Sequence, residues 1–326
     1  MIDIIYPKNG ETLSFLSQEQ LDFIAKPEVE ASGRINWSAL RVQGIDGTVP
    51  PPLIVDCSPS VNGKMTIRDA DDSGISWEVP VDSGRAEVYD LMVGHSYDLT
   101  IETDNDRSET IRFSVAEQPP RWIYIDGCNN CRDIGGWKTG GGHHVKQGMI
   151  YRTSELDTHL TITPKGRKQL LDLGMRCEID VRGLGDSASE TMTGTGIRYN
   201  NIKLAAYKDI FTREQKDRYV ETYRLLLDDS NYPLYIHCWG GIDRTGTWVY
   251  ILNGMLGVCE DDLCLDYEIS SFATWGNRSR NSEYFTEFRA ALAEYDDDTQ
   301  KACIRFMLDC GLDKGDIDLL RKKLLV

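Results

Sequence analysis

The apolar pattern of this chain changes its period near residue 118. Before that point, short segments alternate apolar and polar residues with a period of two, most clearly at 97–101 and 111–115. Such alternation indicates half-buried β-strands, and the acidic turn at 104–106 between the two runs predicts a hairpin. Several short strands at this spacing predict a β-sandwich. Further strands are expected at 35–42, 53–57, 65–68 and 75–79.

After residue 118, apolar strands alternate with amphipathic helices. Thr163 with Pro164 predicts a helix that ends at Gly174, and an apolar strand at 177–181 follows it. This alternation predicts an α/β domain whose central, mostly parallel sheet is flanked by helices. A second strand is expected at 234–236, and further helices after Thr212 and at 245–256, 260–272, 283–295, 298–310 and 315–325.

The segment Gln118-Pro119-Pro120 predicts the boundary between the two patterns, because prolines cannot donate the hydrogen bonds of a β-ladder. We therefore expect an accessory β-sandwich domain at 1–118 and an α/β domain at 119–326. The turn-then-tyrosine stretch at 90–97 resembles that of fibronectin type III modules, so the sandwich is expected to be of the fibronectin III or Ig-like kind.

The composition of the chain excludes some classes of protein and of partner. The net charge of -16 makes the chain a poor candidate for binding a phosphate backbone, so we expect no nucleic-acid partner. No apolar run approaches the roughly 18–20 residues of a membrane span. The nine cysteines are scattered and odd in number, which favours a reducing compartment. We expect a cytoplasmic protein, with an exported form that has lost a leader as the alternative.

The candidate catalytic residues lie at 237–246, where the chain passes from the strand at 234–236 into the helix at 245–256. Five residues separate Cys238 from Arg244 on this loop. Loop amides and the N-terminus of the helix can converge on an anion, and Arg244 matches two oxygens of a phosphate. The same positive surroundings lower the pKa of a thiol. The segment therefore predicts a nucleophile at the base of an oxyanion pocket.

This segment, His-Cys-x-x-Gly-x-x-Arg-Thr, resembles the signature of cysteine-dependent protein tyrosine and dual-specificity phosphatases. Residues 128–136 resemble the Asn-x-Arg-Asp-x-Gly-Gly passage of a bacterial tyrosine phosphatase subgroup. Residues 148–156 and 179–182 are similar to further blocks of that subgroup. The blocks occur in family order over roughly 119–326, and the N-terminal third lies outside the resemblance.

The resemblance implies that Cys238 attacks phosphorus and becomes a phosphocysteine, while Arg244 holds the phosphoryl oxygens. It implies that His237 orients the loop and that the Thr245 hydroxyl steadies Cys238 as it leaves. A carboxylic acid then protonates the leaving group and activates water. No cofactor or metal is expected. The substrate-binding residues implied are Trp239, Gly240, Gly241, Ile242, Arg132 and Asp180.

Three aspartates are candidates for the acid. Asp209 comes first because it precedes Cys238 by roughly the distance expected of a mobile acid loop in the wider superfamily. Asp243 comes second, because Asp-Arg-Thr resembles lipid phosphatases of the myotubularin and Sac type. Asp180, beside Arg182, is third. The alternative for all three is an ordinary surface or ion-paired carboxylate.

Several neighbouring residues have open interpretations. Arg132 and Arg152 line the pocket or brace it through Asp133 and Glu155; bracing is favoured, since buried arginines need carboxylates. The cations at 208–218 form a lid or a solvated helix face. The pair Cys128-x-x-Cys131 is a plain turn, half a zinc site, or a redox partner of Cys238.

The favoured substrate is phosphotyrosine in a protein or peptide, with phosphoinositides or inositol phosphates as the alternative. A phospholipid substrate is thus kept among the partners. A hypothesis of another class is an adaptor that binds phosphate without turnover. A third hypothesis is that the N-terminal sandwich carries the main function and binds a carbohydrate or a protein.

Overall fold

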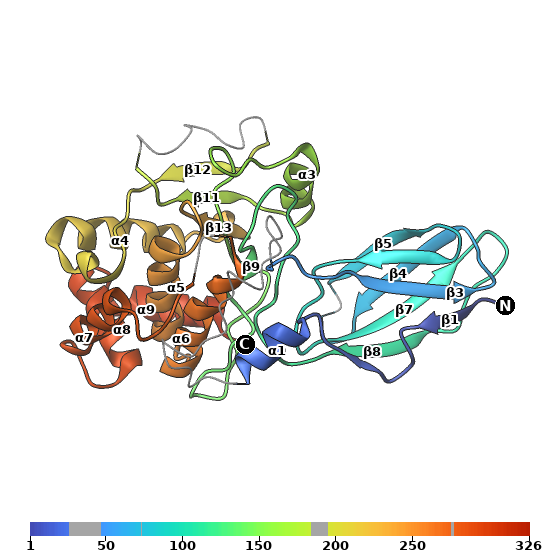
Figure 1. The fold of residues 1–326 in the computed structure, drawn as a ribbon, viewed down its shortest axis with the longest axis horizontal. Helices are drawn as coiled ribbons and strands as arrows, with labels where there is room; N and C mark the ends of the chain where they lie inside the picture. Colours follow the sequence, from blue (N-terminus) through green and yellow to red (C-terminus); the bar gives the residue numbers. More distant parts are fainter. Residues whose placement is uncertain (26–46, 73, 184–194, 275–276) are drawn as a thin grey trace. The chain divides into compact units, whose positions relative to one another are not determined.

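The computed structural model describes residues 1–25, 47–72, 74–183, 195–274 and 277–326 (Figure 1). They form two compact units: Met1–Leu21 with Pro50–Ile123, and Asp22–Val49 with Tyr124–Val326. The units differ from the predicted division at 118/119 in two places: the segment Asp22–Val49 groups with the second unit, and residues 119–123 group with the first. In the segment Asp22–Val49, Phe23 packs edge-on against Phe272 at 5.4 Å, and the amide of Asn130 donates to Thr48 Oγ1 at 2.8 Å. The predicted strand at 35–42 lies outside the described residues.

The first unit contains two β-sheets, and the helix α1 (Gln18–Ile24) begins in it. A single apolar cluster takes side chains from both sheets, including Val55 of one and Ile67 and Leu99 of the other. The strands predicted at 53–57, 65–68, 75–79, 97–101 and 111–115 are present, whereas three short strands escaped prediction. The antiparallel three-stranded sheet has the order β1 (Asp3–Tyr6), β3 (Leu53–Ser58), β6 (Arg85–Val88). The five-stranded sheet has the order β2 (Thr12–Leu13), β8 (Ile111–Val115), β7 (Ser96–Glu102), β4 (Gly63–Asp69), β5 (Ser76–Val81).

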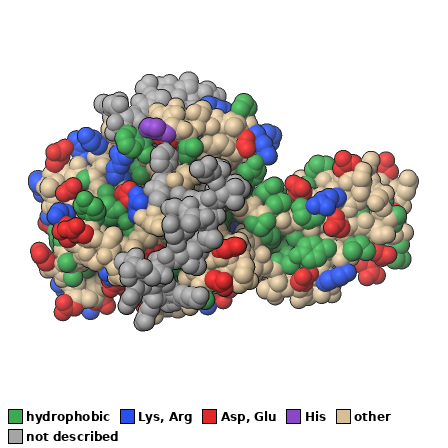
Figure 2. Space-filling model, in the orientation of Figure 1, with side chains coloured by type: hydrophobic (Ala, Val, Ile, Leu, Met, Phe, Trp, Pro, Cys, Tyr) green, Lys and Arg blue, Asp and Glu red, His purple; other side chains and the backbone are tan. Residues whose placement is uncertain are grey.

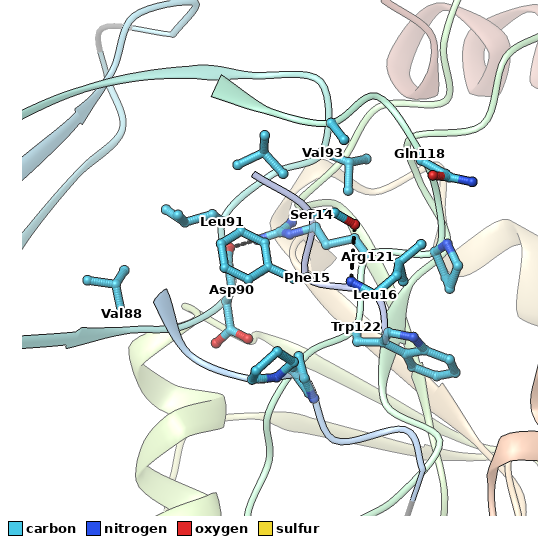
Figure 3. A pocket seen from close by; sticks show the side chains of 15 residues that line it. Ser14, Phe15, Leu16, Val88, Asp90, Leu91, Val93, Gln118, Arg121 and Trp122 are labelled. Atoms are coloured by element: carbon cyan, nitrogen blue, oxygen red, sulfur yellow. Dashed lines mark hydrogen bonds between the residues drawn. The ribbon is translucent and has the colours of Figure 1, made fainter. Parts of the chain in front are cut away.

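A pocket of this first unit is lined mainly by apolar side chains, among them Phe15, Leu91 and Val93 (Figure 3). Arg121 enters it, and Nη2 of its guanidinium donates to the carbonyl of Asp90. None of the residues 237–246 lines this pocket. It is therefore separate from the loop on which the sequence places the chemistry.

The second unit is built on a five-stranded sheet of order β12-β11-β13-β10-β9. The strands β12, β11, β13 and β10 are parallel, and β9 is antiparallel to β10. His237, the last residue of β13, pairs in register with Asp180 of β11 and Thr153 of β10. Ligands bind such sheets at the carboxyl ends of the strands, and the loop after β13 lies there. The bounds are β9 (Arg132–Asp133), β10 (Ile150–Thr153), β11 (Cys177–Asp180), β12 (Arg198–Asn201) and β13 (Leu234–His237).

Helices start where the capping residues predict. Thr163 accepts from the amide of Gly166, and Thr212 accepts from the amide of Gln215. In Figure 1 the yellow to red helices α4 to α9 gather beside the sheet, away from α3. Among the described residues, none of the helices combines the length and apolarity of a membrane span. The helices are α3 (Pro164–Asp172), α4 (Arg213–Leu225), α5 (Asp243–Leu256), α6 (Glu260–Ile269), α7 (Glu283–Ala293), α8 (Thr299–Cys310) and α9 (Lys314–Leu324), with 3₁₀ turns η1 (Tyr207–Phe211), η2 (Asp229–Asn231) and η3 (Ser270–Phe272).

Candidate active site

The loop after β13 makes a tight turn before α5 begins at Asp243. Gly241 has a φ of +64°, and a Cβ atom there would lie 2.2 Å from the carbonyl oxygen of Thr153. Only glycine combines this left-handed backbone with so close an approach. The loop is therefore held against β10, with α5 starting directly behind it.

The carbonyl groups of the loop are tied to the surrounding protein. The Glu155 amide donates to the Trp239 carbonyl at 2.7 Å. Asn130 Nδ2 donates to the carbonyls of both Gly240 and Gly241 at 3.1 Å. In a trans peptide the N–H points opposite to the C=O. The amides of Gly240, Gly241 and Ile242 therefore turn away from these contacts, and with the first turn of α5 they can surround an anion.

Cys238 is buried, with an exposed fraction of 4%. Burial raises its pKa, but the charge of Arg244 and the neighbouring hydroxyl and amide of Thr245 lower it more, so that the pKa lies below its ordinary value. The buried Thr245 hydroxyl completes no hydrogen bond with any described residue, which leaves it available to the sulfur. The guanidinium of Arg244 lies over the ring of Trp239, 5.5 Å from its centroid. The site thus places a thiolate-favouring sulfur beside a cation.

His237 lies fully buried beneath the loop. Its Nε2 is 3.0 Å from Glu178 Oε1, and its Nδ1 is 3.2 Å from the Cys238 carbonyl oxygen. Burial lowers the pKa of His237, while Glu178 and Asp180 raise it more, so that the pKa is raised overall. The structure therefore brings together His237, Cys238, Arg244 and Thr245.

The carboxylate of Asp180 is bound by side chains that lie outside the loop at 237–246. Arg182 binds both of its carboxylate oxygens, at 3.0 and 2.8 Å, and the Tyr199 hydroxyl donates to Oδ2 at 2.9 Å. Burial raises the pKa of Asp180, but Arg182 and the charge of His237 lower it further than that. A buried carboxylate with these partners is an orienting group for the end of β11.

Asp243 lies at the start of α5 and is half-buried. Arg278 holds both carboxylate oxygens, at 2.8 and 2.9 Å, and the Tyr207 hydroxyl donates to Oδ1. Burial raises its pKa, but Arg278 and Tyr207 lower it more, giving a lowered pKa. Asp243 is therefore held as an ionised carboxylate.

Asp209 is exposed on η1, and its carboxylate makes no hydrogen bond or ion pair with another described residue. Two residues before it, Tyr207 contacts Asp243 at the end of the loop. The cations at 208–218 each pair with a carboxylate, which favours the solvated helix face: Lys208 with Glu287, Arg213 with Asp217, Lys216 with Asp309, and Arg218 with Glu214.

Comparison with known proteins decides the family. A model described as the tyrosine phosphatase family matches residues 123–326. The chain belongs to the tyrosine phosphatase family. A Cupriavidus necator protein named "Putative tyrosine-protein phosphatase" is 26% identical over 171 residues, which cover 44% of this chain and 61% of the relative. Inositol diphosphatase DSP3 of Arabidopsis thaliana is 31% identical over 87 residues, covering 25% and 43%. The chain thus spans less than two thirds of either relative.

Solved structures of the Saccharomyces cerevisiae PP-IP phosphatase SIW14 are also similar to this family member. The core catalytic domain in complex with citrate has a TM-score of 0.33 and 16% identity, covering 44% of this chain and 86% of that one. A second structure of the Siw14 catalytic core has a TM-score of 0.35 and 16% identity, covering 58% and 95%.

In this tyrosine phosphatase family member the two arginines before the loop act as braces, but the predicted partners were wrong. Arg132 Nε and Arg152 Nη1 each bind the carboxylate of Asp266, not Asp133 or Glu155. Asp133 instead accepts from the amides of Gly135 and Gly148, because it ends β9 just before the loop that contains both glycines. Glu155 pairs with Arg182 at 2.9 Å, since both lie at the carboxyl edge of the sheet.

Asp266 and Asn130 are functional candidates that sequence reasoning missed. Asp266 lies on α6 with its side chain only 7% exposed. The sequence feature that could have revealed it is an aspartate between Leu265 and Tyr267 in a helix that is mostly buried. Asn130 lay inside a recognised block, and its positive φ of 55° is what aims its amide at the loop.

The cysteine pair of residues 128–131 contains no disulfide, and both thiols are buried. Cys131 Sγ lies 2.8 Å from the Thr153 hydroxyl. A hydrogen bond with Cys131 and burial raise the pKa of Cys128 well above its ordinary value. Cys128 is therefore a poorly reactive thiol at neutral pH.

Proposed function

We propose that this protein hydrolyses phosphate monoesters through a phosphocysteine intermediate, as a phosphatase of the tyrosine phosphatase type. One observation carries the proposal: Cys238, with its lowered pKa, lies at the start of a loop whose carbonyls are bound by Glu155, Asn130 and Arg152. The amides thus turned inward can hold the equatorial oxygens of a phosphoryl group. The family supports this reading.

In the first step, the sulfur of Cys238 forms a bond to phosphorus while the bond to the ester oxygen breaks. Arg244 and the loop amides of Trp239, Gly240, Gly241 and Ile242 stabilise the charge on the transferring group. In the second step, water attacks phosphorus while it gives a proton to the carboxylate that acted as the acid, the P–S bond breaks, and the thiolate leaves. The Thr245 hydroxyl, which neighbours this sulfur, stabilises the departing thiolate.

Asp209 is the acid that we propose for the first step. A general acid must be able to reach the leaving oxygen, whereas Arg278 and Tyr207 occupy both carboxylate oxygens of Asp243. Asp180 is bound by Arg182 within the sheet. Asp209 is exposed and follows Tyr207, which reaches the start of α5. Asp243 remains the alternative, with Arg278 displaced from it.

Phosphotyrosine in a protein or peptide is the substrate class that we propose. Trp239 is 41% exposed and presents an aromatic surface beside the proposed phosphate site, against which a phenyl ring can pack. Residues 239–242 contain no lysine or arginine, whereas a polyanionic substrate needs additional cations. Phosphoinositides or inositol phosphates are the second candidate, because two relatives are named for inositol diphosphate or PP-IP substrates.

The fold class of the first unit, the absence of a nucleic-acid partner and the cellular location are further proposals. The first unit is an accessory β-sandwich of the fibronectin III or Ig-like kind, supported by the shared core of its two sheets. Nucleic acid is not a partner: the net charge is -16, and acidic and basic side chains are interspersed on the described part of the face in Figure 2. We propose a cytoplasmic location.

The test is hydrolysis of p-nitrophenyl phosphate and of a tyrosine-phosphorylated peptide by the full chain. Cys238→Ser should lower kcat by on the order of 10³-fold or more, because oxygen is a far poorer nucleophile here. Cys259→Ser, which changes an exposed thiol, should leave it unchanged. Substantial turnover by Cys238→Ser contradicts the covalent mechanism. Binding of phosphate by an inactive wild-type chain would identify the silent adaptor instead, and preference for an inositol phosphate would select the second substrate class.

A further inference from the structure

A buried carboxylate on the neighbouring strand faces the histidine that precedes Cys238. Glu178 of β11 pairs in register with Tyr235 of β13, and its side chain is fully buried. Its Oε1 lies 3.0 Å from His237 Nε2, and its Oε2 accepts from the Tyr235 hydroxyl at 2.7 Å. Glu178 is one of two buried acidic residues in this four-residue strand, and neither the sequence motifs nor the proposed mechanism uses it.

The hydrogen bonds around His237 determine where its protons lie. The Cys238 carbonyl, 3.2 Å from Nδ1, can only accept a hydrogen bond, and an ionised carboxylate can likewise only accept. The hydrogen bond from Tyr235 favours the ionised form of Glu178. Both ring nitrogens of His237 then face acceptors, and the arrangement is satisfied when both carry a proton.

The charged groups around this histidine favour the same state. Glu178 and Asp180 of β11 raise the pKa of His237, which burial and the charge of Arg182 lower, and the net direction is upward. The ring of Tyr235 stacks on His237 at 6.1 Å. On the other side of β13, the register partner is the uncharged Thr153 of β10.

We propose that Glu178, supported by Tyr235, is a positioning residue that holds His237 as an imidazolium. Its Nδ1–H then fixes the Cys238 carbonyl. Because the Trp239 N–H lies opposite that carbonyl in the same peptide, this contact turns the Trp239 amide toward the bound anion. The role in turnover rests on the proposed function, whereas the protonation of His237 does not.

The protonation state is measured directly by ¹⁵N NMR of the full chain with labelled histidines. The chain contains five histidines, and a His237→Asn variant assigns the signal of interest. In the wild type we expect an imidazolium at pH 7. Glu178→Gln should convert His237 to the neutral form at that pH, because the carboxylate that stabilises its charge is gone. A neutral His237 in the wild type at pH 7 would overturn the proposal.

A milder variant covers the case in which Glu178→Gln does not fold. Tyr235→Phe removes only the hydrogen bond to Glu178 and should move the titration of His237 to lower pH by a smaller amount. Tyr232→Phe is the matched control, since it deletes a buried hydroxyl that donates to the Leu226 carbonyl at 2.7 Å. An equal shift in both variants, or none in Tyr235→Phe, contradicts the proposal.

Activity provides the second readout. Glu178→Gln should lower kcat/KM by on the order of tenfold, the usual effect of losing a charged hydrogen bond. The loss should grow as the pH rises, because the cation is lost on deprotonation. A fall of the same size at every pH would indicate a merely structural role and reject the positioning role. If the wild type hydrolyses no phosphate ester, the proposed function fails, while the NMR experiment still tests the protonation of His237.

Discussion

Arg152 of β10 donates from Nη2 to the carbonyl of Gly241, 2.7 Å away, in the loop that follows β13. Asp266 of α6 holds Arg152 in place and binds Arg132 at the same time. A strand, a helix and the loop are thus joined through a buried ionic cluster. The cluster lies outside the loop and orients it, because a loop alone cannot keep its amides turned inward against their tendency to find water.

Asp266→Asn should lower the free energy of unfolding by about 3 kcal/mol or more, because it leaves two buried arginines without their carboxylate. Burial raises the pKa of Asp266, but Arg132 and Arg152 lower it overall. Its contribution to stability is therefore present above the ordinary carboxyl pKa and is lost as the pH falls through the lowered value. Urea unfolding across acid pH measures both effects. Asp261→Asn on the same helix, whose side chain is 84% exposed, should cost under about 1 kcal/mol, and equal losses would contradict the brace.

Gly241→Ala should abolish most of the phosphatase activity and destabilise the chain. The new Cβ would lie 2.2 Å from the Thr153 carbonyl, on a backbone with φ of +64°. Gly142→Ala separates the two causes, since Gly142 has φ of +79° but nothing within 4 Å of its Cβ position. The control should lose about 1 kcal/mol of stability and no activity. Kinetics and thermal unfolding of the pair give the comparison, and an active Gly241→Ala would refute the close packing of the loop.

Thr245→Val should move the alkylation of Cys238 by iodoacetamide to higher pH by about one unit or more, because a hydrogen bond to the thiolate is lost. In the wild type, Arg244 and Thr245 outweigh burial and keep the pKa of Cys238 below its ordinary value. The thiolate therefore persists as the pH falls, until that lowered pKa is crossed. Mass spectrometry of the peptide that contains Cys238 follows the reaction. Thr222→Val, whose hydroxyl bonds to Tyr219 and Trp248, should leave the profile in place.

Asp209→Asn should lower kcat by about 100-fold for phosphotyrosine, whose leaving group needs a proton, and much less for p-nitrophenyl phosphate, whose leaving group does not. Steady-state kinetics on both substrates show the difference. Asp217→Asn, another exposed aspartate, which pairs with Arg213, is the control. If Asp243→Asn gives this leaving-group pattern and Asp209→Asn does not, Asp243 is the acid.

Patterns within a few neighbouring residues were enough to predict several helices and strands. The helix caps at Thr163 and Thr212 were confirmed because a cap depends on residues within one turn. The short strands β1, β2 and β6 escaped prediction, because two to four residues contain too little periodicity. The grouping of Phe23 and Thr48 with the second unit has no sequence signal, since their partners lie far along the chain.

The sequence by itself determined the proposed nucleophile, the neighbouring cation and the glycine turn, because Cys238, Gly241 and Arg244 share one loop with a required spacing. Only the tertiary structure decided what surrounds them. Asp266 lies 134 positions from Arg132 along the chain, and Glu178 lies 59 from His237, so that no local pattern relates them. A buried carboxylate needs a charged or hydrogen-bonding partner, and the sheet register and the packing of α6 decide which partner it meets.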